Sequence, residues 1–363
     1  MSRSPNVFEK LTLIDDAVTL FINKEIYEGW EDVQITREIN ALASDFQMQL
    51  TDKWRVDKEP WRIQTGDLVH IHAGKKSILT GYVDKIDLSV SANERKVTVS
   101  GRSKTCDLVD CSVTGLNEYA GLNLQEIANK VVAPFKIPVK FLSPPGGAFE
   151  KVTVQQGESV FALLDRLARQ RKLLMYPSYD GFLMFSKNAN KESVSELVQG
   201  VNVLDGHATY DDSNRFSEYI VKGQNHSFLG DEEQSSEAQG SATDEGIERY
   251  RPYVLVAETT ADDSTTTDRA AYEANIRAAN AIEAEVQVQG WFQEDGSFWE
   301  INEIVPCDFG FLGIREKMLV KKVVFIKNNS GTYTTLSLTR SDAYAFDKKV
   351  KKQRKKGWTK GLR

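Results

Sequence analysis

Short segments in which apolar and polar residues alternate dominate both ends of this sequence, and this alternation restricts its fold more than any other feature. Between Ser44 and Thr51 it places Phe46, Met48 and Leu50 on one face, because successive side chains of a strand point to opposite sides. Comparable segments lie at Thr12–Phe21, Leu68–Ile71, Leu79–Leu88 and Lys96–Ser100. Many short strands joined by turns predict a barrel or a sandwich.

The spacing of apolar residues becomes helical in the middle of the chain. Leu124, Ile127, Ala128 and Val131 recur at steps of three and four and predict a helix that Pro134 ends. Ser159 is a candidate N-cap for a second helix, in which Phe161, Leu164, Leu167 and Ala168 share a face. A strand around Val139–Leu142 and a hairpin turning at Ser178–Gly181 complete a small α/β unit.

The last third returns to strands, with two exceptions. Thr266–Ala284 is rich in Ala and Glu and contains no Gly or Pro, which predicts a helix. Asp231–Gly246 is acidic, rich in Ser and Gly and almost free of large apolar side chains. Such a segment has little surface to bury, so we expect a mobile loop there.

A weak internal repeat links the two ends of the chain. Leu79–Asp110 reads as strand, turn near Asn93, strand and then Arg102-Ser103; Leu319–Asp347 reads as strand, turn at Asn328–Gly331, strand and then Arg340-Ser341. Two related β-domains explain this repeat.

Composition indicates a globular protein. The 363 residues are 40% hydrophobic and 27% charged, and they contain neither an apolar run of membrane-spanning length nor an apolar signal segment behind the polar start. Three cysteines, Cys106, Cys111 and Cys307, indicate a reducing compartment without a disulfide framework. We therefore expect a protein that remains in the cytoplasm where it is synthesised.

Charge is unevenly distributed along the chain. The net charge is -6, yet the last sixteen residues hold nine Lys or Arg and no acid. The body is therefore acidic and the tail basic. A basic tail suits an anionic partner, although such runs are commonly only solvated.

No pattern of catalytic or metal-binding residues emerges. His70 and His72 share a face of a predicted strand, but further ligands are not in sight. Adjacent acids cannot flank one bond when they lie on a strand, and the pairs here are Asp15-Asp16, Asp211-Asp212 and Asp262-Asp263. The isolated His207 and His226 lack a triad pattern. We assign no catalytic, cofactor or metal residue, and predict that Trp54, Trp61, Trp291 and Trp299 anchor a core or a subunit contact.

Several segments together resemble the baseplate hub family of contractile-tailed phages, the phage Mu type, which is related to the late control protein D group. The resembling segments are, in chain order, Trp30–Arg37, Phe46–Thr51, Gly66-Asp67, Leu79–Asp84, Gly101–Asp110, Pro134-Phe135, Gln156–Ser159, Asp165–Ala168, Gln289–Trp291, Leu319–Phe325 and Thr339–Ala343. Their order and spacing carry the resemblance over nearly the whole chain.

This resemblance implies a mainly β protein with α+β parts, in which two similar β-barrel domains and a small α/β domain assemble as a trimeric ring. The ring would join a six-fold tail tube to a three-fold central spike and give tape-measure protein and DNA a path during ejection. It further implies a late virion protein that is assembled in the host cytoplasm without stable membrane insertion. The expected division is 1–115, first barrel; 116–200, α/β domain; 201–346, second barrel with the loop 231–246 and the helix 266–284; 347–363, basic tail.

Three alternatives stay open from the sequence. A tail protein can carry a peptidoglycan hydrolase, and Val152–Ser159 with the helix that follows faintly resembles a LysM cell-wall binding unit. The hub-like part of a type VI secretion spike has the same expected fold, but this sequence lacks a long β-helical needle.

Overall fold

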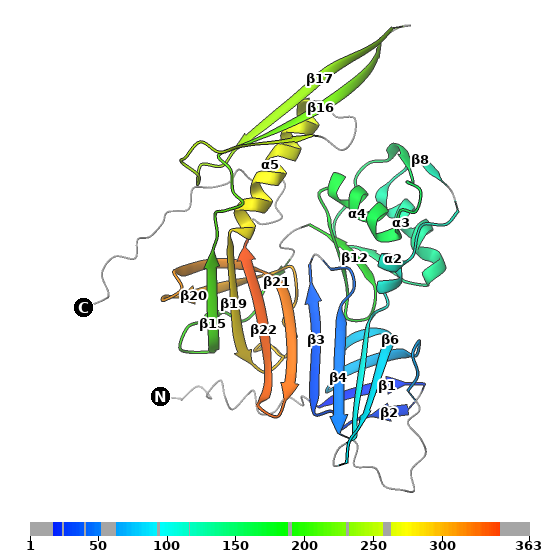
Figure 1. Ribbon diagram of the computed structural model, residues 1–363, viewed down its shortest axis with the longest axis vertical. Coiled ribbons are helices and arrows are strands. Elements are labelled where there is room, and N and C mark those ends of the chain that lie inside the picture. Colours follow the sequence, from blue (N-terminus) through cyan, green and yellow to red (C-terminus); the bar gives the residue numbers. More distant parts are fainter. Residues whose placement is uncertain are drawn as a thin grey trace, which may run out of the picture.

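Strands dominate the protein, as the alternation predicted. The structure is a computed structural model that describes residues 17–23, 25–39, 41–51, 63–92, 95–115, 117–187, 191–229, 232–256 and 263–341. Fourteen of its strands belong to one sheet, which carries a compact α/β unit on one side and a long projecting arm on the other (Figure 1). None of the helices in these residues is long and apolar enough to cross a membrane.

The first β-module contains the strands predicted near the N-terminus, except that residues 12–16 of the segment predicted at Thr12–Phe21 lie outside the described residues. Its strands are β1 (Val18–Ile22), β2 (Glu25–Tyr27), β3 (Asp32–Glu38), β4 (Asp45–Thr51), β5 (Leu68–Ala73), β6 (Lys76–Val90) and β7 (Arg95–Ser103). They lie side by side in the order β3-β4-β7-β6-β5-β1-β2. Phe46 and Met48 of β4 are buried in the core, which confirms the face predicted from their spacing.

The middle unit has a hydrophobic core of its own. Its elements are α2 (Cys106–Asp110), β8 (Glu118–Leu122), α3 (Leu124–Val132), a 3-10 turn (Ala133–Phe135), β9 (Val139–Phe141), β10 (Phe149–Thr153), α4 (Val160–Gln170), β11 (Leu174–Pro177) and β12 (Leu183–Ser186). Both predicted helices are confirmed. Asn123 and Glu126 form a reciprocal capping box at α3, and Ser159 accepts a hydrogen bond from the amide of Ala162 at α4.

The second β-module follows the middle unit and ends the described chain. Its strands are β13 (Lys191–Glu192), β14 (Leu197–Val198), β15 (Val203–Tyr210), β19 (Ile282–Gln289), β20 (Glu303–Phe309), β21 (Ile314–Asn328) and β22 (Gly331–Arg340). Four of its strands lie in the order β15-β19-β22-β21. β20 pairs with the N-terminal half of β21. The C-terminal half of β21 pairs with β3 of the first module. One sheet and one core therefore run through both modules.

The two modules are built alike, as the internal repeat predicted. Five strands occur in the same spatial order in each: β3-β4-β7-β6-β5 in the first, β15-β19-β22-β21-β20 in the second. The hairpins β6–β7 and β21–β22 each contain a bulge, at Asp84 and at Lys321. When the bulges are matched, Arg102 corresponds to Thr339, so the sequence comparison that paired it with Arg340 was one residue out of register. Among the described residues, the strand pairing of neither module closes on itself.

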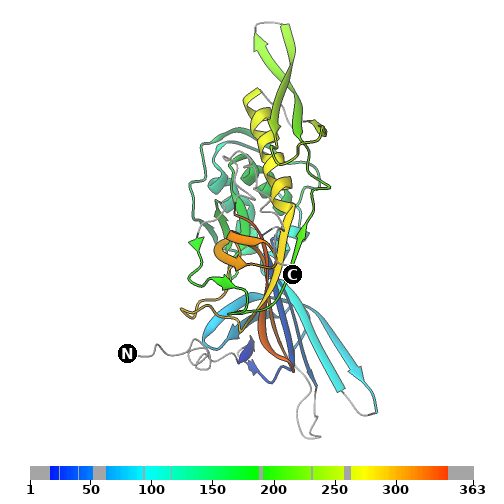
Figure 2. The same cartoon turned by 90° about the vertical axis from the view of Figure 1, so that its left-hand side faces the viewer.

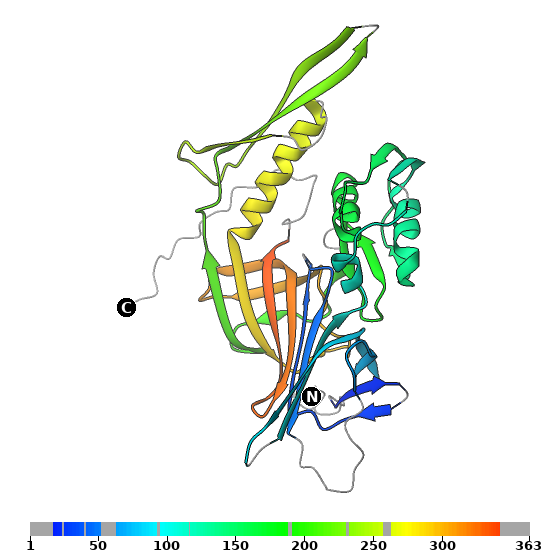
Figure 3. The ribbon, with the colours of Figure 1, turned by 45° about the vertical axis from the view of Figure 1, so that its right-hand side comes forward.

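The arm interrupts the second module between β15 and β19, where the first module has only the short connection 39–44. It contains β16 (Glu218–Leu229), β17 (Glu232–Thr243), β18 (Pro252–Val256) and α5 (Asp263–Asn280). Figures 2 and 3 show α5 lying along the β16–β17 hairpin. Ala270, Ala274 and Ala278 of the helix pack there with Tyr219 and Val221.

Two predictions within this region were wrong. The segment predicted as a loop, 231–246, forms β17 over Glu232–Thr243, paired residue for residue with β16. Pairing with β16 satisfies the backbone of this segment, and α5 packs against it near Gly240. The helix predicted to reach residue 284 ends at Asn280, because Ile282, Ala284 and Val286 alternate into the core as part of β19.

Candidate assembly surfaces and the junction between the domains

One buried arginine joins three parts of the chain. Arg37 of β3 donates from Nη1 to Oε1 of Glu300, at 2.7 Å, and from Nη2 to the carbonyl oxygen of Pro177, at 2.7 Å. Its guanidinium lies 3.7 Å from the centre of the Tyr179 ring, and the Tyr179 hydroxyl donates to the carbonyl oxygen of Trp299. The first module, the middle unit and the second module therefore meet at one side chain.

The sequence places Arg37 in the core by strand geometry. Val33, Ile35 and Arg37 lie on the same face of β3 and are all buried. Burial lowers the pKa of the guanidinium, but Glu300 and Tyr179 together outweigh this effect and the pKa is raised. Burial also raises the pKa of the neighbouring Tyr179 well above its ordinary value. In this cluster, the ring of an un-ionised tyrosine stacks against a paired cation, which is a structural arrangement.

A buried acid fixes residues 191–195, the strap that contains β13, to the second module. The Glu303 side chain is fully buried; its Oε1 lies 2.9 Å from the Lys191 ammonium, and its Oε2 accepts from Gln293 at 2.9 Å. Gln293 also accepts from the Ser193 hydroxyl. Burial raises the pKa of Glu303 despite the ion pair with Lys191. Both polar partners of this acid hold the strap to the module.

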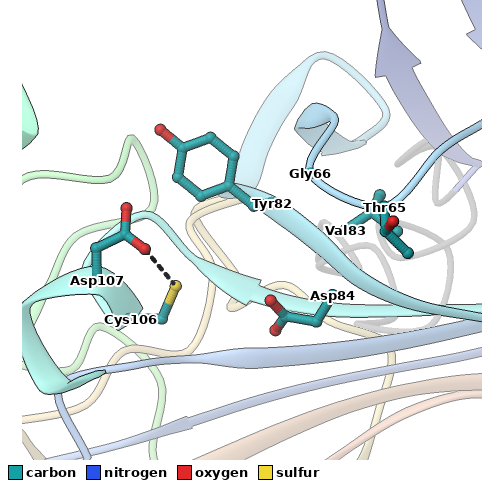
Figure 4. A pocket seen from close by; sticks show the side chains of 7 residues that line it. All are labelled: Thr65, Gly66, Tyr82, Val83, Asp84, Cys106 and Asp107. Atoms are coloured by element: carbon teal, nitrogen blue, oxygen red, sulfur yellow. Dashed lines mark hydrogen bonds between the residues drawn. The ribbon is translucent and has the colours of Figure 1, made fainter. Parts of the chain in front are cut away.

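An open pocket lies between the first module and α2 (Figure 4). It is lined by Thr65, Gly66, Tyr82, Val83, Asp84, Cys106 and Asp107. The Cys106 sulfur is 3.8 Å from Oδ1 of Asp107, and burial, with Asp107 adding to it, raises the pKa of the thiol to about 12. A thiol that stays protonated at neutral pH is a poor nucleophile, so Cys106 is not activated for nucleophilic attack in this pocket.

The structure places the two histidines singled out in the sequence beside hydroxyl and aromatic neighbours. His70 and His72 share the outward face of β5, where His70 contacts the Thr80 hydroxyl at 3.2 Å. The His72 ring meets Phe21 edge to face at 4.9 Å. In the described part of the chain, no group of three or more His, Cys, Asp or Glu side chains is placed to hold a metal ion.

The carboxylate pair that the structure describes in full has a structural role. Asp211 accepts from the backbone amide of Ser213, and Asp212 pairs with Arg215 at 2.7 Å. The pair Asp15-Asp16, residue Asp262, and the basic tail 347–363 lie outside the described residues, as do Trp54, Trp61 and Trp358. Trp291 and Trp299 are buried, which confirms the core interpretation for these two.

Each β-module exposes part of a strand edge. In the second module, β15 ends the strand order. In the first module, β6 pairs with β5 from Lys76 to Tyr82 but with β7 as far as Val90, so Lys85–Val90 has no strand on its outer edge among the described residues. Large apolar side chains are exposed along both edges: Leu88 (68%) and Val90 (78%) on β6, Leu204 (57%) and Tyr210 (55%) on β15.

Exposed edges that carry apolar side chains are sites of pairing with another chain. The sequence predicted the strands themselves but not which edges stay open. That property depends on how far β5 accompanies β6, which periodicity does not reveal.

Three family profiles match this chain, and all describe phage baseplate proteins. Residues 17–103 match "Mu phage baseplate assembly protein GpP-like, N-terminal". Residues 105–187 match "Baseplate hub protein gp44-like, second domain", and residues 261–347 match "Mu phage baseplate assembly protein GpP, fourth domain".

Full-length comparisons agree with these profiles. The baseplate hub protein gp44 of Escherichia phage Mu is 31% identical over 355 residues, which cover 95% of this chain and 93% of that protein. A solved 43 kDa tail protein of prophage MuSo2 from Shewanella oneidensis is 30% identical with a TM-score of 0.83, over 90% of this chain and 99% of that one.

A more distant structure shares the fold alone. The c3393 protein of E. coli, a component of the type VI secretion system with structural similarity to T4 tail proteins gp27 and gp5, is 10% identical with a TM-score of 0.56. The match covers 88% of this chain and 76% of that one.

Proposed function

Because the chain belongs to the baseplate hub family of Mu-type phages, a structural component of the phage tail, we propose that it forms the central homotrimeric ring of a contractile-tail baseplate. The observation that carries this proposal is the pair of β-modules with the same strand order in one chain. Three such chains supply six similar modules. One face of the ring can then meet a six-fold tail tube while the other holds a three-fold spike.

The open modules also fit a ring. Each would become a complete barrel-like unit only when its free edge pairs with a neighbouring copy, since closed rings are built from heterologous contacts. In this proposal the ring sits on the central spike, transmits the contraction stroke and contacts the tail tube and other baseplate proteins.

We further propose that the ring's axis is the path for tape-measure protein and DNA once the spike leaves. The body of the chain is acidic, while the nine basic residues of the last sixteen lie in the tail. A channel wall that does not bind phosphates lets DNA slide past. A basic lumen in the assembled ring would contradict this part of the proposal.

The basic tail is proposed to dock on an acidic tail component. A chain truncated after Asp347 should keep its oligomeric mass and fail to join the baseplate. Normal assembly of this truncated chain would remove the tail from the mechanism.

Mass measurement in solution over a range of concentrations tests the ring itself. The expected result is a species of three times the chain mass of 40.8 kDa. A monomer at every concentration would overturn the proposed function.

A non-enzymatic role is part of the proposal, and it is supported by the hub and tail names of the relatives. The open alternatives are a tail-associated peptidoglycan hydrolase and a cell-wall binding module. A zymogram on cell wall and a pull-down with cell wall test them, and the proposal expects no clearing and no retention.

We also keep the four-part division 1–115, 116–200, 201–346 and 347–363 as a proposal, with virion assembly in the host cytoplasm. Leu108 of α2 belongs to the core of the middle unit, so that core begins before the proposed boundary at 115.

A further inference from the structure

The contact between the two modules within one chain specifies a second contact between chains. Inside the chain, the C-terminal half of β21 pairs antiparallel with β3. The position of β21 in the second module is that of β6 in the first, and the position of β3 in the first is that of β15 in the second. Among the described residues, no strand pairs with the outer edge of β15 or with the outer edge of Lys85–Val90 in β6.

We propose that the outer edge of β6 pairs with β15 of a neighbouring copy of this chain, in the same way as β21 pairs with β3. This proposal rests on the proposed ring and names the strand edges that close it. The occupant of each exposed edge is therefore a second copy, because the chain already contains one version of the same joint.

The strand registers fix which residues meet. Matching the bulges makes Lys85, Leu88 and Val90 equivalent to Lys322, Phe325 and Lys327. Matching β4 to β19 through their partners on β7 and β22 makes Val33, Ile35 and Glu38 equivalent to Gly206, Ala208 and Asp211. Because Phe325 faces Ile35 and Lys322 faces Glu38, Leu88 would face Ala208 and Lys85 would face Asp211.

Burial and charge agree with this register. Phe325 and Ile35 are fully buried in the internal joint, whereas Leu88 at the equivalent place is 68% exposed and would be covered by the neighbour. The internal joint sets a lysine opposite a glutamate, and the proposed joint sets a lysine opposite an aspartate. Opposite charges that face each other across strands stabilise the pairing.

Disulfide trapping tests the register directly. In a Cys111→Ser background, which removes the exposed native thiol, the pair Leu88→Cys and Ala208→Cys should give covalent dimers and trimers on mild oxidation. The control pair, Leu88→Cys and Thr209→Cys, is one residue out of register and turns the second thiol to the other face of the sheet. Because a disulfide requires Cβ atoms about 4 Å apart, we expect on the order of tenfold more cross-linked chain from the first pair.

The outcomes separate this inference from the proposed function. A trimeric mass with no preference for the first pair would overturn the β6–β15 joint and leave the ring intact. A monomeric mass at every concentration would overturn both.

Charge exchange is an independent measurement. Lys85→Glu alone and Asp211→Lys alone should each weaken trimer formation, and the double variant should restore it toward that of the unaltered chain. If both single variants associate normally, or if the double variant is as weak as the worse single variant, Lys85 does not face Asp211 and the register is wrong.

Discussion

At Arg37, one guanidinium holds together segments that are more than a hundred residues apart in sequence. We expect Arg37→Ala to lower the free energy of unfolding by about 3 kcal/mol, because it breaks a largely buried ion pair and leaves a carbonyl oxygen without its donor. Arg315→Ala is the matched control, since its pair with Asp308 is exposed and should contribute less than about 1 kcal/mol. Denaturant unfolding measures both, and equal losses would refute the role of Arg37 in the junction.

Glu303 makes stability depend on pH. Its folded-state pKa is raised, mainly by burial, so the folded state binds its proton more tightly than the unfolded state does. The contribution of this acid to stability is therefore fully present below its unfolded pKa and is lost as pH rises through the folded pKa. Glu303→Gln should match the unaltered chain near pH 4 and have the higher melting temperature at pH 7. A melting-temperature difference that does not change with pH would contradict this assignment.

Residue-level prediction from sequence succeeded where spacing and residue type indicate the same environment. Phe46, Met48 and the Ser159 cap follow directly from spacing and residue type. Arg37 shares the spacing of Val33 and Ile35, but only the distant Glu300 and Pro177 make the burial of its charge possible. Such partners cannot be identified from local sequence.

At the scale of elements, the stability of the arm depends on the close contact between α5 and β17. A Cβ atom at Gly240 would overlap the backbone nitrogen of Thr267, so the helix and the strand touch at this point. Gly240→Ala should destabilise the arm by about 1–3 kcal/mol through overpacking and make it more sensitive to limited proteolysis. Gly147→Ala is the control, because nothing lies within 4 Å of its Cβ position; equal protease sensitivity would show that the contact is loose.

The errors at the element scale share one cause. Composition predicted a loop at 231–246 and a helix through residue 284. In both places, pairing with a neighbouring strand determines the structure instead. β16 supplies a partner to every residue of β17, and β22 supplies one to Glu283 and Ala284. Local propensity is overridden where a neighbouring strand is available.

For the whole molecule, a ring closed by strand pairing should be more stable at higher protein concentration. Association favours the folded state by mass action, so the melting temperature should rise by about 1–3 °C per hundredfold increase in concentration. Leu88→Lys, which places a charge in the proposed joint, should abolish the dependence, while Ile26→Lys on β2, an exposed side chain outside the joint, should preserve it. A melting temperature independent of concentration in the unaltered chain would argue against a ring held by these edges.

The lengths of two equivalent connections have a geometric consequence. Residues 39–44 join β3 to β4 in the first module, whereas the whole arm is inserted between β15 and β19 in the second. Likewise the middle unit follows β7 in the first module, and nothing of its kind is described after β22. In a ring of alternating modules, the middle unit would follow one set of three modules and the arm would project from the other three. The ring of six similar modules would then have only three-fold symmetry, because these two insertions differ.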